Sequence, residues 1–391
     1  MSKHLLPALS LATFACLVNG CAGPDRTVSR PAADNLRAVS NAIQSVKTRF
    51  APDPHLNIFT VNVESAGGGL ALTGDVDRAE VKAETVRAVA SAGFKVSDHI
   101  AVLPDAELGN ETWGVTCLSV ANGREEDNHK AELGTQTLMG EVVRVWKRTG
   151  RWLLVQSADA YLSWMERGSL KLCTKEEADA WQHSPLLIVT ALESLIQDQP
   201  RADGQPVSDV VLGCLVKKTG EEAEWFKVEL PDGRSGYLAK NSATDYAAWR
   251  TSRRATPENI ERAARQFLGR PYLWGANTPR GLDCSGFTKL VYFLNGIELN
   301  RNASQQALQG VEVPLDSDLA KLRKGDLLFF GFERGDERPG RVSHVGIYLG
   351  DKLFIQSSQL VRLSSLDPGS PIRDAMRIRG LLKARRVLPD N

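Results

Sequence analysis

A cysteine at the start of an apolar helical pattern is the first residue in this chain with the chemistry of a nucleophile. Cys284 lies in the segment GLDCSGF, and Phe287, Leu290, Val291 and Leu294 follow it at helical spacing. A thiol in the first turn of a helix lies at the positive end of the helix dipole, which favours the thiolate that attacks carbonyl carbon. The alternative is a small buried residue without a chemical role, as most free cysteines are.

A thiol nucleophile needs a base that later returns the proton to the leaving amine, and the pKa of histidine suits both steps. The chain has 6 histidines, and only His344 falls within the last predicted domain. It lies in the strand-like segment RVSHVGIYLGD, where His344, Gly346 and Tyr348 share one face. A polar imidazole beside a glycine indicates an opening on that face, so His344 is the predicted base.

A third polar residue must hold the other nitrogen of the imidazole. A hairpin with a three-residue loop at residues 349–351 would place His344 opposite Gln356, with their Cβ atoms about 5 Å apart. A two-residue loop would place Ser357 there instead, and a slip of one residue turns a side chain to the other face. We prefer Gln356, whose amide oxygen can accept the imidazole N–H. A strand glutamine with only a structural hydrogen bond is the alternative.

Residues 255–391 form the predicted domain that positions these groups. Thr256 and Pro257 are a favourable N-cap and first-turn pair for a helix that precedes the cysteine helix. The later segments KGDLLFFG, RVSHVGIYLGD and KLFIQSSQ have the patterns of strands. Helices followed by an antiparallel sheet predict an α+β fold.

Residues 110–250 contain an internal repeat. VWKRTG is echoed by LVKKTG, and the spacing from Trp152 to Trp164 recurs from Trp225 to Tyr237. Short strands with turn signals predict two small β-barrels, over residues 110–172 and 185–250, joined by the helical segment TKEEADAWQH. These units resemble bacterial SH3-like domains, which often accompany cell-wall enzymes.

The N-terminal part is predicted to contain an export signal and a small domain. Residues 1–20 carry a lysine and an apolar run too short to span a bilayer. The run leads into VNGC at residues 18–21, which resembles the lipobox of bacterial lipoproteins. Acylation of Cys21 would anchor the mature chain to a membrane through the linker 21–34, and an ordinary cleaved signal is the alternative. The residue after Cys21 is Ala22, which resembles a sorting signal for the outer membrane if the cell has two membranes. Residues 35–105, ordered α-β-β-α-β, resemble a BON domain.

The overall composition narrows the function classes. The 48 basic and 47 acidic residues are balanced, which gives no indication of nucleic-acid binding. The sequence has neither an HExxH motif nor a cysteine and histidine cluster of zinc spacing, so no metal or other cofactor is predicted. After export, Cys117, Cys173, Cys214 and Cys284 would remain in an oxidising compartment. A bridge between Cys117 and Cys173 is one pairing that the sequence leaves open.

The last domain resembles the NlpC family of papain-like cell-wall cysteine peptidases. The resemblance lies in RPYLWGANTPRGLDCSGFTKLVY, GDLLFF, SHVGIYLGD and KLFIQSS. It implies that Cys284 is the nucleophile, His344 the base and Gln356 the third polar residue. Many members carry histidine at that third place, so the neutral Gln356 leaves the rate and its pH dependence open. Ala276, where a second glycine is common, is a smaller departure.

The resemblance also implies a substrate, namely peptidoglycan stem peptides cut between γ-linked D-glutamate and the diamino acid. Members with tandem SH3-like domains favour stems with a free N-terminal L-alanine, and acceptors for its ammonium group would form charge-assisted bonds. The positions that match such a role, or that of pocket closure, are Asp283, Ser285, Tyr272, Ser304, Tyr161 and, in a looser alignment, Glu141. Asp283 is also a candidate helix N-cap, and Tyr161 a candidate barrel core residue. The Cys284 N–H and the Tyr272 hydroxyl are candidate oxyanion donors.

The sequence therefore predicts a lipid-anchored cysteine endopeptidase of the cell envelope. A non-catalytic peptidoglycan-binding lipoprotein, in which the papain-like fold is only a scaffold, is the first alternative. Acyltransferase or amidase chemistry on lipids, with a similar Cys-His pair, is the second, and the tandem SH3-like domains argue against it.

Overall fold

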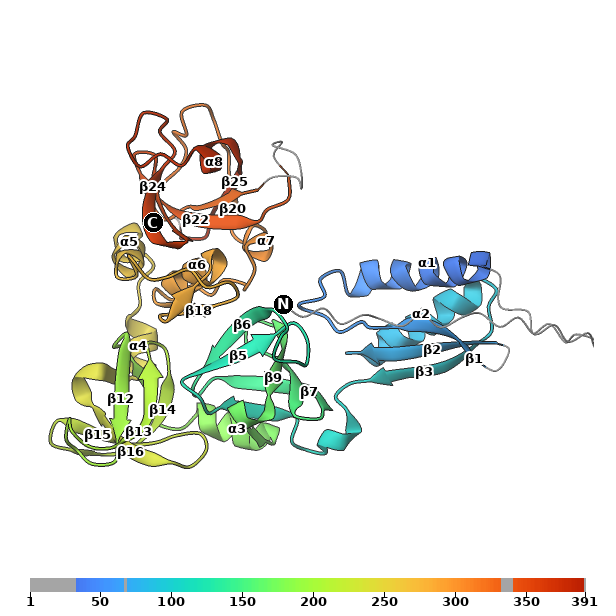
Figure 1. Cartoon of the computed structure of the whole chain (residues 1–391), viewed down its shortest axis with the longest axis horizontal. Helices are drawn as coiled ribbons and strands as arrows, with labels where there is room; N and C mark the ends of the chain where they lie inside the picture. The colour runs from blue at the N-terminus through green and yellow to red at the C-terminus, as the bar shows by residue number, and fades with distance from the viewer. Residues whose placement is uncertain (1–32, 67–68, 332–339, 390–391) are drawn as a thin grey trace, which may run out of the picture.

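The computed structural model describes residues 33–66, 69–331 and 340–389 as four successive domains (Figure 1). The predicted export signal, Cys21 and Ala22 lie outside the described residues. Within the described residues, no helix combines the length and the apolar character needed to cross a bilayer.

The first domain packs two helices against a three-stranded sheet in the predicted α-β-β-α-β order. Strands β1 and β2 are antiparallel, and β2 and β3 are parallel. Its core contains Val39, Leu72, Val81 and Val89, all completely buried. The elements are α1 (Ala33–Phe50), β1 (Asn62–Ala66), β2 (Gly69–Val76), α2 (Ala79–Ser91) and β3 (Val96–Val102).

Two seven-stranded antiparallel units form the middle of the chain, and they repeat each other as predicted. Trp152 and Trp225 each begin the strand that pairs with the next strand of the repeat. The first unit contains β4 (Trp113–Thr116), β5 (Val120–Arg124), β6 (Leu133–Leu138), β7 (Val142–Thr149), β8 (Trp152–Gln156), β9 (Leu162–Glu166) and β10 (Leu170–Cys173). The second contains β11 (Leu186–Val189), β12 (Glu193–Gln197), β13 (Pro206–Val211), β14 (Leu215–Glu222), β15 (Trp225–Glu229), β16 (Ser235–Ala239) and β17 (Ala243–Asp245). Helix α3 (Lys175–Gln182), with the capping box Thr174 and Glu177, joins the units, and α4 (Tyr246–Ser252) follows them.

The last domain has the predicted α+β plan, with helices first and a six-stranded antiparallel sheet after them. The strand order is β20-β25-β21-β22-β23-β24. Phe287 and Val291 of α6 share a buried core with Val345 and Ile347 of β22. The elements are α5 (Pro257–Arg265), β18 (Asn277–Thr278), β19 (Gly281–Leu282), α6 (Cys284–Phe293), α7 (Ala303–Gln306), β20 (Val311–Val313), β21 (Leu327–Phe330), β22 (His344–Gly350), β23 (Leu353–Ser358), β24 (Leu360–Ser365), α8 (Ala375–Arg379) and β25 (Leu381–Arg386).

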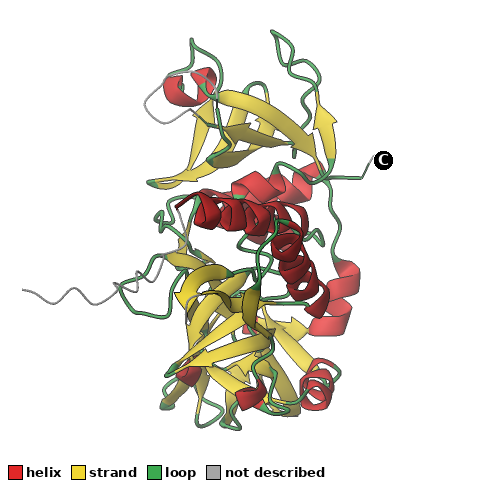
Figure 2. Cartoon of the chain, turned by 90° about the vertical axis from the view of Figure 1, so that its right-hand side faces the viewer, coloured by secondary structure: helices red, strands yellow, loops and turns green. Residues whose placement is uncertain are grey.

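The first SH3-like domain is hydrogen-bonded directly to the segment that precedes the cysteine helix. The backbone N–H of Gln136 donates to Asn277 Oδ1 at 2.8 Å, and Asn277 Nδ2 donates to the Gln136 carbonyl at 3.1 Å. Figure 2 shows the sheet of the last domain on one side of the molecule and the SH3-like barrels on the other, with helices between them. This contact fixes the barrel beside the N-terminus of α6.

The four described cysteines, Cys117, Cys173, Cys214 and Cys284, are all free and buried. The pairing between Cys117 and Cys173 that the sequence left open is therefore not formed in this structure.

Position 286 requires a glycine because the cysteine helix packs closely against β18. A Cβ at this position would overlap the carbonyl oxygen of Ala276 and the backbone of Asn277. We expect Gly286→Ala to lower the free energy of unfolding by about 1–3 kcal/mol, as overpacking usually does. Urea denaturation would measure this change. Gly168→Ala is the control, because no atom lies within 4 Å of a Cβ built there. Equal stability of the two variants would contradict the packing argument.

Candidate active site

Cys284 opens onto a cavity of about 330 Å³ that three domains line together. Most of the predicted site residues line it, namely Tyr161, Tyr272, Asp283, Cys284, Ser285 and Ser304. Other lining residues were not predicted and include His55, Glu125, Glu132, Trp274 and Arg301. The structure therefore brings the nucleophile candidate together with most of the proposed substrate contacts.

Cys284 is the first residue of α6, and Asp283 is the N-cap that starts the helix. The Asp283 carboxylate accepts the backbone N–H of Gly286 at 2.7 Å. Burial raises the pKa of the Cys284 thiol to about 11, and the Asp283 charge adds to this shift. A hydrogen bond from the Val345 N–H acts in the opposite direction. Since Val345 follows His344 in β22, the thiol lies beside the strand that carries the imidazole.

His344 is the first residue of β22 and is buried. Its Nε2 donates to Gln356 Oε1 at 2.7 Å. Because an amide oxygen can only accept, this contact places the ring proton on Nε2 and leaves Nδ1 as the free acceptor. Burial lowers the pKa of His344 to about 3, and the nearby Arg377 charge contributes. The resting pair is thus a neutral thiol and a neutral imidazole.

The predicted hairpin register was wrong, although the predicted contact forms. The loop has two residues, Asp351 and Lys352, both with positive φ, and a bulge between Tyr348 and Gly350 precedes it at the end of β22. Ile347 pairs with Ile355, so Gln356 lies opposite Gly346 and reaches His344 diagonally. The register differs by two residues from the prediction, which keeps Gln356 on the same face. Ser357 points to the other face, where its hydroxyl donates to the Leu282 carbonyl at 2.6 Å.

Gln356 is itself held by groups that the sequence did not reveal. Its Nε2 donates to Ser364 Oγ at 2.8 Å and to Asp374 Oδ2 at 3.0 Å. Because a carboxylate only accepts, Asp374 fixes which end of the amide faces His344. Arg377 also donates to Gln356 Oε1, at 3.3 Å. The neutral Gln356 therefore has a carboxylate directly behind it.

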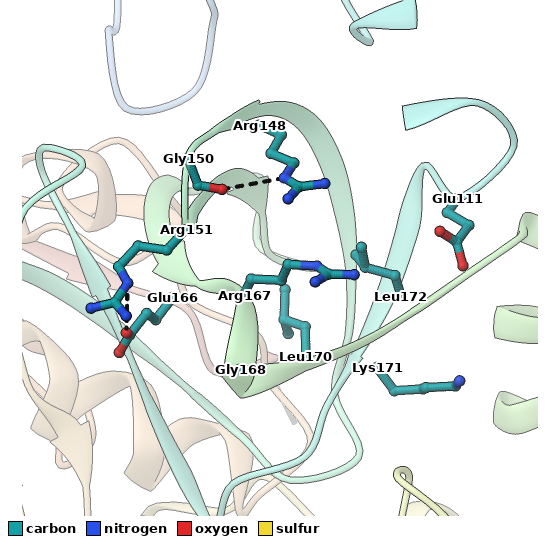
Figure 3. A pocket seen from close by; sticks show the side chains of 10 residues that line it. All are labelled: Glu111, Arg148, Gly150, Arg151, Glu166, Arg167, Gly168, Leu170, Lys171 and Leu172. Carbon is teal, nitrogen blue, oxygen red and sulfur yellow. Dashed lines mark hydrogen bonds and ion pairs between the residues drawn. The ribbon is translucent and has the colours of Figure 1, made fainter. Parts of the chain in front are cut away.

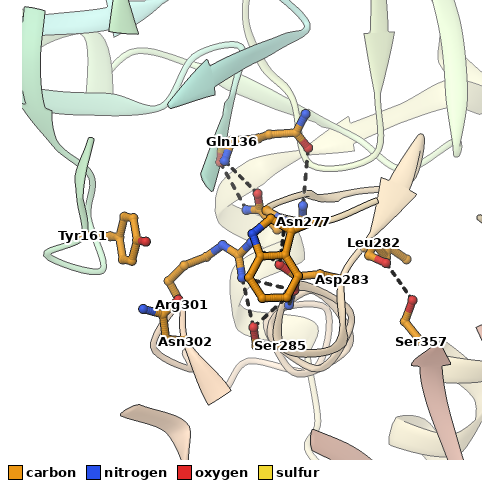
Figure 4. A network of polar contacts seen from close by, with 12 residues as sticks. Gln136, Tyr161, Asn277, Leu282, Asp283, Ser285, Arg301, Asn302 and Ser357 are labelled. Atoms are coloured by element: carbon orange, nitrogen blue, oxygen red, sulfur yellow. Dashed lines mark hydrogen bonds and ion pairs between the residues drawn. The ribbon is translucent and has the colours of Figure 1, made fainter. Parts of the chain in front are cut away.

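A buried ion pair lies under the cavity, and Figure 4 shows its contacts. Arg301 donates to both oxygens of Asp283, at 2.5 and 3.2 Å, and to Ser285 Oγ at 3.0 Å. Asp283 also accepts the Gly275 N–H at 3.0 Å. The carboxylate predicted to receive a substrate ammonium is therefore already neutralised by a guanidinium. Asp283 serves as the predicted N-cap, and the sequence contained no signal for Arg301 as its partner.

Glu141 does not belong to this cavity. It lines a separate cavity of about 450 Å³ at the junction of the two SH3-like domains and the last domain, where burial raises its pKa to about 7. The carboxylate beside Tyr161 is Glu125, which accepts the Tyr161 hydroxyl at 2.9 Å. Burial opposes its ionisation, but hydrogen bonds from His55 and Tyr161 outweigh this and lower the Glu125 pKa. The sequence had offered Glu141 as a further carboxylate, and in the structure Glu125, directly after β5, takes that place.

Another concave surface, of about 710 Å³, lies on the first SH3-like domain (Figure 3). Arg148, Arg151, Arg167 and Lys171 make it basic, and none of the predicted catalytic residues lines it. The candidate active site is therefore the cavity of Cys284.

The neutral resting pair predicts how Cys284 reacts with iodoacetamide. Since its pKa is raised to about 11, the thiolate fraction should rise about tenfold per pH unit between about pH 6 and pH 9. Peptide mass spectrometry would follow alkylation of Cys284, with Cys284→Ala as the blank. A rate independent of pH over this range would instead indicate a preformed thiolate–imidazolium pair.

Gln356 and Asp374 should affect activity in a graded way. Gln356→Ala removes the acceptor that orients His344, and losses of this kind are roughly 10- to 100-fold in kcat. Asp374→Ala should lower kcat by a smaller factor, because Gln356 still offers its amide oxygen to His344. Some loss is expected, since the amide can then rotate and present its nitrogen instead. Asp374→Asn has one acceptor oxygen, which can keep either the cap of α8 or the bond from Gln356 Nε2, so it should retain more activity than Asp374→Ala, which has neither. Steady-state kinetics of the three variants would test this order, and a larger loss in Asp374→Asn than in Asp374→Ala would contradict it.

Comparisons with known proteins agree with the fold. The profile of the NlpC/P60 family matches residues 269–379, and that of the bacterial dipeptidyl-peptidase Sh3 domain matches residues 124–170. The chain is 30% identical over 266 residues to a gamma-D-glutamyl-L-lysine dipeptidyl-peptidase of Bacillus cereus, covering 66% of this chain and 76% of the relative. It is 28% identical to dipeptidyl-peptidase 6 of Lysinibacillus sphaericus, covering 66% of this chain and 93% of that protein.

A crystal structure of an NlpC/P60 family protein from Bacillus cereus superposes with a TM-score of 0.59 at 25% identity. The superposition covers 71% of this chain and 100% of that chain. The chain belongs to the NlpC/P60 family of cysteine peptidases.

Proposed function

We propose that this protein is a cysteine endopeptidase that hydrolyses peptidoglycan stem peptides between γ-D-glutamate and the diamino acid, with a preference for a free N-terminal L-alanine. The observation that carries the proposal is the cavity itself. It combines the Cys284 thiol with the Glu125 carboxylate and the Tyr161 hydroxyl, beside the strand that bears His344. Relatives named as gamma-D-glutamyl-L-lysine dipeptidyl-peptidases support the substrate class.

The neutral pair sets the order of the chemical steps. Since the thiol holds its proton at rest, His344 Nδ1 takes that proton as Sγ attacks the carbonyl carbon of the γ-D-glutamyl bond. The Cys284 N–H and the Tyr272 hydroxyl are the proposed donors to the oxyanion. The imidazolium then protonates the leaving amine of the diamino acid. Water, activated by the same imidazole, hydrolyses the thioester and frees the thiol.

Gln356 and the groups behind it stabilise the charged intermediate. When His344 becomes an imidazolium, its Nε2–H still donates to Gln356 Oε1. The amide carries no charge, but Asp374 lies 3.0 Å from Gln356 Nε2 and places a carboxylate behind it. Gln356 and Asp374 thus favour protonated His344 in a site where burial and the Arg377 charge disfavour it.

Recognition of the substrate amino terminus is assigned to Glu125. Its lowered pKa keeps it ionised at neutral pH, and an ionised acceptor binds an ammonium group strongly. Tyr161 donates to Glu125 and orients it. Asp283 and Ser285, both bonded to Arg301, form the structural floor of the pocket. Ser304 and Tyr272 line its remaining walls.

The proposal includes a place in the cell. Acylation of Cys21 would anchor the protein in the cell envelope, at the outer membrane if the cell has two membranes. Detergent partitioning of the full-length protein, compared with Cys21→Ser, would test this part. An unchanged partition of the variant would reject the lipid anchor.

The peptidase activity is tested with L-Ala-γ-D-Glu-diaminopimelate and L-Ala-γ-D-Glu-L-Lys peptides and mass spectrometry of the products. We expect the wild type to release the dipeptide L-Ala-D-Glu and Cys284→Ala to release none. Cys117→Ala, which removes a buried thiol outside the cavity, is the matched control and should remain active. Activity of Cys284→Ala would reject the mechanism. Retention on peptidoglycan sacculi without any cleavage by the wild type would support the non-catalytic alternative.

A further inference from the structure

The N-terminal domain contributes a side chain to the cavity of Cys284, which nothing in its sequence indicated. His55, in the connection between α1 and β1, lines the cavity together with Glu125 and Tyr161. Its ring is stacked on Tyr161, with centroids 5.2 Å apart and an interplanar angle of 19°. Its Nε2 lies 3.5 Å from Glu125 Oε2, while the Tyr161 hydroxyl occupies Glu125 Oε1. The two residues assigned to the substrate amino terminus are thus both in contact with His55.

The loop that carries His55 is held on both sides. On the SH3-like side, the Leu162 N–H donates to the His55 carbonyl at 2.7 Å, and Gln156 Nε2 donates to the Leu56 carbonyl at 3.2 Å. On the side of the last domain, Gln305 Nε2 donates to Asp53 Oδ2 at 2.8 Å. Gln305 belongs to α7, whose Ser304 lines the cavity. The loop therefore bridges two walls of the same cavity.

The domain behind the loop is firmly docked. Ile58 and Leu103 of the first domain share a buried cluster with Trp146 and Leu162 of the first SH3-like domain. Lys147 Nζ lies 2.7 Å from Asp75 Oδ2, at the same interface. Figure 1 shows the two domains side by side. Because apolar burial and an ion pair both hold the interface, the position of His55 is set by the fold.

We propose that His55 is a specificity-determining residue, a wall at the amino-terminal end of the substrate pocket that excludes stem peptides whose first residue carries an acyl group. This inference rests on the proposed function. A free ammonium group is small and can share Glu125 with His55. An acylated nitrogen has no charge for Glu125 and needs space that the imidazole ring occupies. The ring is 34% exposed, so its open edge faces solvent and its stacked face covers Tyr161.

Electrostatic contacts also favour the position of the His55 ring beside Glu125. A hydrogen bond to Glu125 is the main reason that the His55 pKa is raised, with the charges of Glu125 and Asp53 adding to it. A raised pKa favours the protonated ring, in which Nδ1 can donate to Asp53 and Nε2 can donate to Glu125. Its bonds to Glu125 and Asp53 hold the ring over Tyr161 without a contribution from the substrate.

The test compares the full-length protein with His55→Ala on two peptides, L-Ala-γ-D-Glu-diaminopimelate and its N-acetyl form. We expect wild type to prefer the free peptide and His55→Ala to lower the ratio of the two kcat/KM values at least about fivefold, mainly through faster cleavage of the acetylated peptide. The matched control is His129→Ala. His129 also contacts an aromatic ring, Trp152, and a carboxylate, Glu166, but it is outside the cavity.

A second variant separates the ring from its hydrogen bond. His55→Phe keeps an aromatic ring over Tyr161 and removes the bond to Glu125, so we expect it to keep the discrimination of the wild type. The proposed role of His55 would be overturned if the ratio of the two kcat/KM values were unchanged in His55→Ala, or if His55→Phe lowered it as much as His55→Ala. Failure of the wild type to cleave either peptide would instead reject the proposed function, and the inference with it.

Discussion

The site depends on one buried carboxylate, that of Asp283. Its two oxygens accept the N–H groups of Gly275 and Gly286, the Ser285 hydroxyl and the Arg301 guanidinium. These bonds begin α6 at Cys284, fix the loop before it and compensate a charge that burial would otherwise make very unfavourable. Removing either ion-pair partner would leave the other charge buried and unpaired. The position of the nucleophile is therefore set by the satisfaction of this group.

The pocket is an assembly of domains around that fixed point. The last domain supplies the Cys284 thiol, with His344 buried on the strand beside it, the first SH3-like domain supplies Glu125 and Tyr161, and the N-terminal domain supplies His55. Hydrogen bonds between Gln136 and Asn277 hold the first two in register. Since Glu125 and Tyr161 are distant from α6 in sequence, reaction and recognition are encoded in separate segments. The division allows the recognition surface to differ while the catalytic pair stays the same.

Local patterns were sufficient to predict much of the fold and the reacting groups. Helical spacing after Cys284 and alternation around His344 placed both residues correctly on their elements, because these patterns reflect contacts within one helix or strand. The repeat in the middle of the chain predicted two similar barrels. Gln356 was predicted on a register two residues off, and the contact still formed, because an even shift preserves the face of a strand.

The sequence by itself therefore determined which residues begin the helix, which face the imidazole occupies and that a polar partner lies on that face. Only the tertiary structure decided which charges meet. Arg301 joins Asp283, Asp374 lies behind Gln356, Glu125 replaces Glu141 beside Tyr161, and His55 arrives from another domain. The physical reason is that periodicity records the short-range geometry of one element. Contacts between distant segments depend on how whole domains bury their surfaces, and no local pattern records that.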